Sequence, residues 1–242
     1  MSFAPNQITQ ARGKDAAHGP LPAMLLALTG VTGFVDAISY LKLGHVFVAN
    51  ITGNIAFLGF AVADAKEFSI GASLTATAAF LVGALGGGRL GVRAGSHRGR
   101  LLANGILVEV VVVGIALIAS IVTSDLAGEL AQYELIVLLA LAMGMQSAVA
   151  RKLGVPDLPT TVLTLTLAGL AADSSLAGGN NLRASRRLLA TGTVLLGAAA
   201  GAWLIFHLGI CAVLAVAFVL LAASGIAAYR NIRSTDKWTV GT

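Results

Sequence analysis

One acidic residue, Asp36, interrupts a run of apolar residues that is long enough to cross a membrane. A carboxylate in hydrocarbon costs free energy unless it is neutralised or paired, so Asp36 predicts a functional group. It would bind a cation, carry a proton or hold a polar substrate. In the alternative interpretation, Asp36 pairs locally with Lys42, His45 or the polar residues of the next segment, and only holds the fold.

Polar residues also begin the short apolar segment that follows Asp36. Asn50, Thr52 and Asn54 would either line a solute pathway or form hydrogen bonds between helices. A second short segment, later in the chain, is rich in threonine. Its hydroxyls would either line the pathway or bond to carbonyls of their own helix, and its candidates for the pathway are Thr161 and Thr164.

Two more polar residues lie inside apolar runs. Glu109 stands in the run LVEVVVVG and is either a second proton site or the partner of another buried group. Gln146 aligns with Asp36 when the two halves of the chain are compared, so an acid occurs at this position in one half only. The residues that we expect to line a substrate or ion pathway are Asp36, Asn50, Thr52, Asn54, Glu109, Gln146, Thr161 and Thr164.

The sequence does not favour catalysis or a metal site. No cluster of His, Cys or carboxylate residues has the spacing of a metal site, and the single cysteine, Cys211, excludes an intrachain disulfide. No nucleophile and base occupy matched positions. We therefore expect no enzyme, no metal and no cofactor.

Composition places the chain in a membrane. Hydrophobic residues make up 57% of it and charged residues 11%, whereas soluble domains carry about 25% charged residues. The net charge of +5 does not require a nucleic-acid partner, because Lys and Arg mark the cytoplasmic side of membrane proteins. We expect the lipid bilayer and a small polar or ionic solute as partners, and no nucleic acid; a homo-oligomer is left open.

Eight apolar segments follow a polar tail of residues 1–20, which we expect to be disordered and cytoplasmic. None alternates polar and apolar residues as the strands of a membrane β-barrel do, so the fold class is all-α. Two segments, 47–63 and 158–172, are short, and each begins beside a glycine or proline break. The other six are 21–41, 70–88, 101–122, 135–150, 188–208 and 210–229.

The basic residues indicate how many segments cross. Arginines crowd the link at 89–100, and further Lys and Arg precede the first segment, follow Ala150, precede the seventh segment and close the chain. All of these positions are cytoplasmic only if the two short segments enter the membrane and return, which leaves Lys42 and Lys66 outside. We therefore predict an all-α integral membrane protein with six transmembrane helices plus two re-entrant or broken helices. Both termini would be cytoplasmic, in a bacterial inner membrane; eight full spans is the alternative.

The two halves of the chain resemble each other, which indicates an internal repeat. The aligned pairs are Asp36 with Gln146, Leu43-Gly44 with Leu153-Gly154, Thr52 with Thr161, Gly83 with Gly197 and Gly87 with Gly201. Three crossings per half is an odd number, so the halves would have opposite orientations. We predict a single membrane domain at 21–230 with inverted repeats at 21–122 and 132–229, followed by a cytoplasmic tail at 231–242.

The chain resembles the YoaK family of bacterial integral membrane proteins in four stretches, GFVDAISYL, VFVANITGN, GMQSA and LPTTVLTLTL. The resemblance covers residues 21–229. It implies a membrane location and about six spans. It implies no established activity, so function has to be inferred from the residues.

Inverted repeats with broken helices are typical of transporters, in which the broken ends meet near the bilayer midplane and form the site. We therefore expect a small-solute transporter or channel-like protein, with a proton on Asp36 as one mechanism. The alternative is a membrane scaffold or assembly factor that uses the same polar residues for helix packing. A water-filled path joining Asp36, Asn54 and Gln146 would favour transport, whereas an interior with every polar group paired would favour the scaffold.

Overall fold

The computed structural model describes residues 18–122, 128–156, 163–180, 184–231 and 237–239. Within these ranges the chain is all-helical and contains no strand, as the sequence predicts. Two 3₁₀ turns, η1 (Ser175–Ala177) and η2 (Lys237–Thr239), accompany eight α-helices. The α-helices are α2 (Leu21–Lys42), α3 (Ile51–Val62), α4 (Ile70–Ala94), α5 (Arg98–Val122), α6 (Glu129–Leu153), α7 (Leu163–Ala172), α8 (Ala184–Leu208) and α9 (Ile210–Asn231).

Six of these helices are long and apolar enough to cross a membrane, namely α2, α4, α5, α6, α8 and α9. The other two are short: α3 has 12 residues and α7 has 10. Each is therefore at most about 18 Å long, well short of a hydrocarbon core of roughly 30 Å. The prediction of six long helices and two short ones is confirmed for the described residues.

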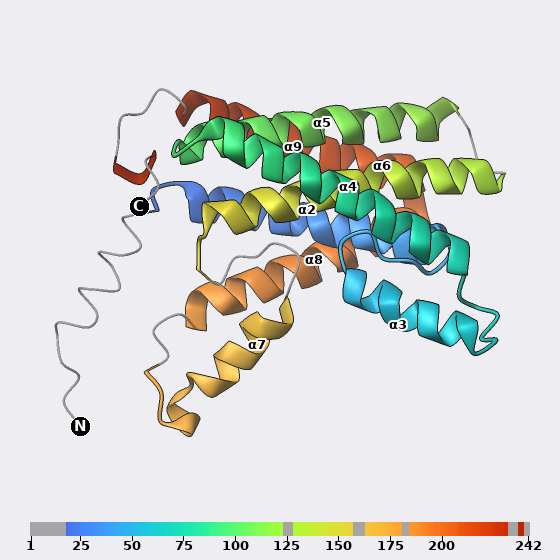
Figure 1. The fold of residues 1–242 in the computed structure, drawn as a ribbon, viewed down its shortest axis with the longest axis horizontal. Helices are drawn as coiled ribbons and strands as arrows, with labels where there is room; N and C mark the ends of the chain where they lie inside the picture. The colour runs from blue at the N-terminus through green and yellow to red at the C-terminus, as the bar shows by residue number, and fades with distance from the viewer. Residues whose placement is uncertain (1–17, 123–127, 157–162, 181–183, 232–236, 240–242) are drawn as a thin grey trace.

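The six long helices lie side by side, and the two short helices project from one side of the bundle at opposite ends (Figure 1). After α2, residues 43–50 turn back toward the middle of the bundle, and α3 then runs outward to the end at which α2 finished. α7 lies near the other end, where α6 finishes and α8 begins. Each short helix thus returns the chain to the end from which it came.

Glycines let α4 and α6 pack backbone against backbone. A Cβ atom on Gly83 would overlap the carbonyl oxygen of Leu141, and one on Gly144 would overlap that of Phe80. A Cβ on Gly87 would lie 2.8 Å from the Cβ of Ala148. Small residues are what permit two membrane helices to approach this closely. The contact between α4 and α6 is therefore fixed by the positions of these glycines.

The α2–α8 pair is built in the same way. A Cβ on Gly33 would lie 2.6 Å from the carbonyl oxygen of Val194, and one on Gly197 would overlap that of Gly30. The glycines that are spaced along these helices therefore serve close packing, as small residues do in other membrane bundles.

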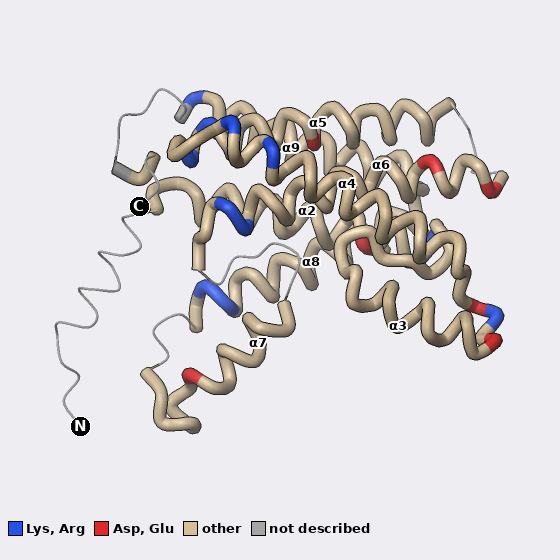
Figure 2. Tube along the Cα trace, viewed as in Figure 1, with Lys and Arg blue, Asp and Glu red and all other residues tan. Residues whose placement is uncertain are grey.

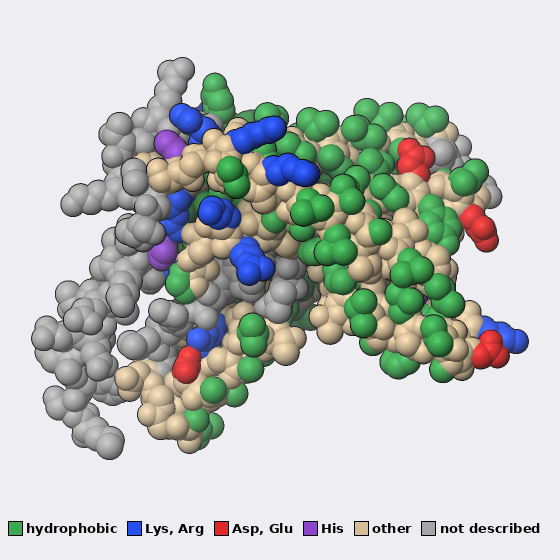
Figure 3. All heavy atoms as spheres, in the orientation of Figure 1, with side chains coloured by type: hydrophobic (Ala, Val, Ile, Leu, Met, Phe, Trp, Pro, Cys, Tyr) green, Lys and Arg blue, Asp and Glu red, His purple; other side chains and the backbone are tan. Residues whose placement is uncertain are grey.

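Two helices, α2 and α6, form the interior of the bundle. Their most apolar windows are 67% and 56% buried, whereas those of α8 and α9 are 22% buried. The outer helices instead present leucines, valines and isoleucines over the surface of the molecule, as the hydrophobic side chains in Figure 3 show. Polar groups on the inner faces of α2 and α6 are therefore enclosed by protein.

Charge divides the two ends of the bundle (Figure 2). Arg93, Arg151 and Arg230 lie in the last turns of α4, α6 and α9, which finish at one end. Glu129 lies in the first turn of α6, at the opposite end. We call the arginine-rich end the basic end. This separation agrees with the charge distribution from which the orientation was predicted.

Candidate functional site

Asp36 lies half-buried on α2 and contacts the backbone just before α3. Its carboxylate oxygen Oδ1 accepts a hydrogen bond from the N–H of Ala49 at 3.3 Å. Within the described chain no ion pair joins it to Lys42 or His45, and the His45 ring packs edge-to-face on Tyr40. The acid therefore holds the turn against α2 through the backbone.

Two asparagines fix the same turn. Asn54 is fully buried, and its side chain accepts from the N–H of Phe47 at 2.8 Å and donates to the carbonyl of Phe47 at 2.5 Å. Asn50 caps α3 by accepting from the N–H of Gly53 at 3.4 Å. Both amides thus act on the backbone of the turn. Thr52, in the first turn of α3, is exposed.

The N-terminus of α3 points toward the middle of the bundle (Figure 1). The start of a helix carries a partial positive charge, because its first N–H groups lack partners within the helix. Asp36 lies beside this helix start through its bond to Ala49. A carboxylate and a helix N-terminus therefore lie together, an arrangement in which the negative charge and the helix dipole stabilise each other.

Gln146 links the two inner helices. It is fully buried on α6, and its Nε2 donates to the hydroxyl of Thr32 at 2.9 Å and to the carbonyl of Leu28 at 3.4 Å. Thr32 precedes Asp36 on α2 by one helical turn. The Oε1 atom of Gln146 is buried and has no hydrogen-bond partner within the described chain. Gln146 therefore joins α6 to α2 close to the acid while keeping one acceptor unused.

Glu109 is the second buried acid. It lies on α5, 1% exposed, and its Oε2 has no hydrogen-bond partner among the described residues. A Cβ on Gly105, one turn before it, would lie 3.0 Å from Val149, which follows Gln146 by one turn on α6. α5 and α6 run antiparallel (Figure 1), so this contact places Glu109 and Gln146 at about the same level of the bundle. The two unpaired oxygens thus share one layer of the bundle.

The second short helix is held by an arginine that the sequence did not single out. Arg187 on α8 is 8% exposed, donates to the carbonyl of Gly169 in α7, and forms an ion pair with Asp173 at 2.7 Å. The sequence placed Arg187 only in a topological cluster, because nothing in the spacing links it to Asp173. Thr164 is exposed on α7. Thr161 lies outside the described residues.

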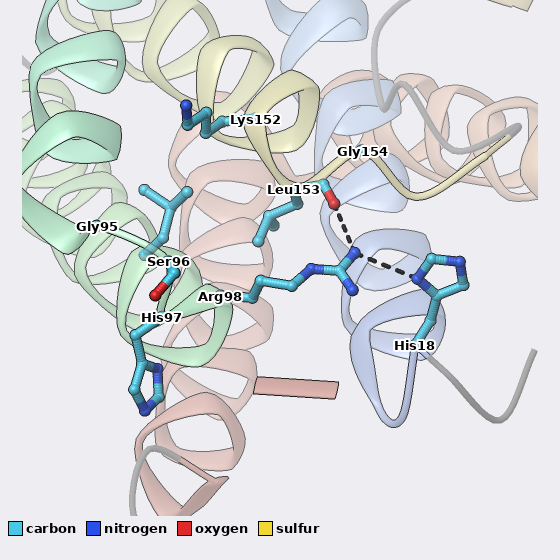
Figure 4. Close-up of a pocket in the computed structure, with 9 residues that line it drawn as sticks. His18, Gly95, Ser96, His97, Arg98, Lys152, Leu153 and Gly154 are labelled. Atoms are coloured by element: carbon cyan, nitrogen blue, oxygen red, sulfur yellow. Dashed lines mark hydrogen bonds between the residues drawn. The ribbon is translucent and has the colours of Figure 1, made fainter. Parts of the chain in front are cut away.

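A basic cavity opens at the basic end. It has a volume of about 390 Å³, and its walls include His18, His97, Arg98 and Lys152. The Arg98 guanidinium points between α6 and the start of α2, donating to the carbonyl of Leu153 at 2.5 Å and contacting Nδ1 of His18 at 3.2 Å (Figure 4). Lys152 and His97 point away from it. Arg98 thus joins three parts of the chain.

Trp238 closes the same end of the molecule. Its side chain is 6% exposed, and its ring lies 2.6 Å from a Cβ built on Gly19 and 3.4 Å from one built on Gly99. The residues before α2, the start of α5 and the η2 turn therefore meet at the basic end. Sequence reasoning missed this contact, because residues 231–242 carry too few apolar residues to predict a packed segment.

The predicted site residues are only partly brought together. Asp36 and Asn54 hold one turn, Gln146 lies one turn from Asp36 through Thr32, and Glu109 shares the level of Gln146. Thr164 belongs to α7 and takes no part in this group. The basic cavity and a groove between α4 and α6 are lined by none of the candidates. Asp36, Asn54, Gln146 and Glu109 therefore form a polar layer within the bundle and line neither the basic cavity nor the groove.

A family model described as "Protein of unknown function (DUF1275)" matches residues 24–227. The chain belongs to this family. The UPF0700 transmembrane protein YoaK of Bacillus subtilis (strain 168) is similar to it, with 35% identity over 160 residues that cover 66% of this chain and 69% of that protein. No solved structure matches. The resemblance to the YoaK family that the sequence stretches indicate is confirmed.

Family membership and the six apolar helices agree on a multi-pass membrane protein. The DUF1275 description carries no activity, and neither does the name of the Bacillus protein. A function for this family member has to be argued from the geometry of its polar residues.

Proposed function

We propose that this chain is a bacterial inner-membrane transporter or channel-like protein for a small polar or ionic solute. The proposal rests on the course of the two short helices. Each returns the chain to its own end, and α3 begins beside the half-buried carboxylate of Asp36. Irregular backbone at membrane depth is tolerated only where protein covers it or water reaches it. Both termini would be cytoplasmic, the partners would be the bilayer and the solute rather than nucleic acid, and no catalysis is implied.

An inverted repeat is part of this proposal, and the glycine contacts support it. In such a repeat, α2 of the first half corresponds to α6 of the second, and α4 corresponds to α8. The contact between α4 and α6 then has the contact between α8 and α2 as its equivalent. The matching contacts are Gly83 on Leu141 with Gly197 on Gly30, and Gly144 on Phe80 with Gly33 on Val194. Three spans in each half then give the halves opposite orientations, as in many transporters.

These contacts favour a register that differs by one residue from the sequence alignment. They pair Gly33 with Gly144, so Asp36 corresponds to Ser147 and not to Gln146. The acid still has a neutral counterpart. The proposed site is therefore chemically one-sided: only the first half supplies a carboxylate, at the start of α3.

In this proposal the solute passes along the side of the bundle from which α3 and α7 project. It meets Asp36, the N-terminus of α3 and exposed Thr52 on the way. Gln146 and Glu109 lie deeper. During passage the carboxyl group of Glu109 would carry a proton, and the amide oxygen of Gln146 would accept a hydrogen bond.

A membrane scaffold is the second candidate, and one observation favours it. Asn54 uses both ends of its amide on Phe47, and Gln146 uses its amino group on α2, so much of the polar interior holds the fold. A scaffold needs no water path to Asp36. The two functions therefore differ in whether water reaches the start of α3.

Thiol labelling tests the proposal. In a Cys211→Ser background, a cysteine at Thr52 should react with a membrane-impermeant thiol reagent, because a transport path brings water to the start of α3. A cysteine at Leu107, which is 61% exposed on the outer face of α5, should stay unreactive in lipid. If Thr52→Cys is as unreactive as Leu107→Cys from both sides of the membrane, the transport proposal fails and the scaffold is favoured.

A screen of small solutes by melting temperature is a second test of the transport proposal. A ligand that binds only the folded state raises the melting temperature. Asp36→Asn should keep the fold, because the amide fills the same space, but should lose the stabilisation by the solute. A stabilising solute that acts equally on the wild type and on Asp36→Asn would remove Asp36 from the site.

A further inference from the structure

A groove runs between α4 and α6 on the outer surface of the bundle. It has a volume of about 740 Å³, and its walls are mainly apolar, including Phe80, Val92 and Ala148. From Phe80 to Val92 it follows α4 for about 18 Å, at 1.5 Å per residue. This is close to the depth of one leaflet, since the whole hydrocarbon core measures roughly 30 Å.

Two arginines close this groove at the basic end. Arg89 of α4 and Arg151 of α6 both line it, and both side chains are exposed. Neither makes an ion pair or side-chain hydrogen bond with another described residue. α4 contains no acidic residue, and the nearest acid on α6, Glu134, lies about 25 Å from Arg151 along the helix. The two positive charges therefore have no protein counter-charge on either helix.

The floor of the groove is open at Gly88. A Cβ built on Gly88 would meet nothing within 4 Å, whereas one built on its neighbour Gly87 would meet Ala148 at 2.8 Å. Gly87 thus permits the close contact between α4 and α6, whereas the space beside Gly88 is unoccupied by protein atoms. Figure 3 shows Lys and Arg side chains gathered where α4 and α6 approach this end, with hydrophobic side chains continuing along α4.

We propose that the groove between α4 and α6 binds one anionic phospholipid of the leaflet at the basic end. The phosphate would lie between Arg89 and Arg151, and an acyl chain would lie over Gly88 toward Phe80. Basic pockets between membrane helices bind anionic headgroups in this way. The apolar part of the groove would accommodate an acyl chain, whereas free phosphate would contact only the two arginines. This binding site is independent of the proposed transport function.

Native mass spectrometry of the purified protein, with equal amounts of phosphatidylglycerol and phosphatidylcholine, tests the proposal. The wild type should retain phosphatidylglycerol preferentially. Arg89→Gln with Arg151→Gln should weaken that binding by about thirty-fold, because each cation beside an anionic lipid contributes about a factor of five. Arg100→Gln with Arg230→Gln removes the same charge at the same end and should leave binding unchanged.

A glycine pair tests the apolar part without changing charge. Gly88→Leu places a side chain in the groove and should displace the lipid while keeping the fold, because a Cβ at this position meets no protein atom within 4 Å. Gly192→Leu, on α8, is the matched control, since a Cβ there also meets nothing within 4 Å. If the arginine pair fails to fold, the Gly88→Leu protein decides the question.

Three results would overturn the lipid site. The first is equal retention of phosphatidylcholine and phosphatidylglycerol by the wild type. The second is that Gly88→Leu binds phosphatidylglycerol as well as Gly192→Leu does, or that the Arg89/Arg151 double variant binds it as well as the Arg100/Arg230 double variant does. The third is stabilisation by inorganic phosphate alone that depends on Arg89 and Arg151, which would make the occupant a free anion.

Discussion

At the scale of single residues, the polar interior divides into groups that hold the backbone and groups with a spare atom. Asn54 is the clearest of the first kind, because one side chain satisfies both backbone groups of Phe47. Glu109 and Gln146 are of the second kind. An unpaired buried polar atom costs about 1–3 kcal/mol, so removing Asn54 and removing Glu109 should have opposite effects on stability. Gln146 is of both kinds, because its Nε2 also bonds to Thr32, and its removal should therefore cost stability.

Asn54→Leu should lower the stability of the folded protein by about 2–4 kcal/mol, because it leaves the part-buried N–H and carbonyl of Phe47 without their side-chain partner. The measurement is the melting temperature in detergent. Thr52→Val, on the exposed side of the same helix, should change it little. Equal melting temperatures for the two variants would show that Asn54 does not hold the turn.

Glu109→Met should keep or raise the melting temperature, because an apolar side chain of similar size replaces a carboxyl oxygen that has no partner. Gln146→Met should lower the stability of the folded protein by about 1 kcal/mol, and with it the melting temperature, since its bond to Thr32 is lost. A clear loss of stability in Glu109→Met would mean that Glu109 has a structural partner in the folded protein.

The sequence could predict which polar residues are buried, but not what they contact. Asp36, Asn54, Glu109 and Gln146 each stand in an apolar run, and an apolar run predicts enclosure. The partner of Asp36 is the backbone N–H of Ala49, in a turn that folds back on α2. Residue types alone do not predict such a contact, because every residue except proline has a backbone N–H. Arg187 was missed for the same reason, because its role follows from where α7 ends.

At the scale of elements, glycines set which helices touch. Gly83, Gly144 and Gly87 bring α4 onto α6, whereas Gly88, one residue further, faces outward. The spacing of glycines predicted a packing face in the sequence. It could not predict the partner helix, because α4 packs on a helix from the other half of the chain.

Gly83→Ala should destabilise the protein by at least about 1–3 kcal/mol, because the new methyl group would overlap the backbone carbonyl of Leu141 and force α4 from α6. Gly88→Ala should be neutral or slightly stabilising, since alanine favours a helix by about 1 kcal/mol over glycine. Melting temperatures of the two variants give the comparison. Similar values would mean that α4 and α6 are not in backbone contact.

At the scale of the whole molecule, the basic residues and the contacts between distant parts of the chain gather at the same end of the bundle. The arginine-rich link between α4 and α5, the residues before α2 and the η2 turn meet around Arg98 and Trp238. Composition and charge predicted six spans because both are properties of whole segments.

Reporter fusions test this arrangement as a whole. A reporter that is active only in the cytoplasm should be active at Gly95, at Gly178 and at the C-terminus, and inactive at Ala65 and at Gly128. Lys and Arg are retained on the cytoplasmic side, and each short helix returns to its own end. Eight full spans with the same N-terminal side would instead put Ala65 and Gly128 inside and Gly95 outside. An active reporter at Gly128 with Gly95 still active would therefore overturn the orientation. An active reporter at Ala65 together with an inactive one at Gly95 would show that α3 crosses the membrane, and would remove the re-entrant site on which transport is proposed.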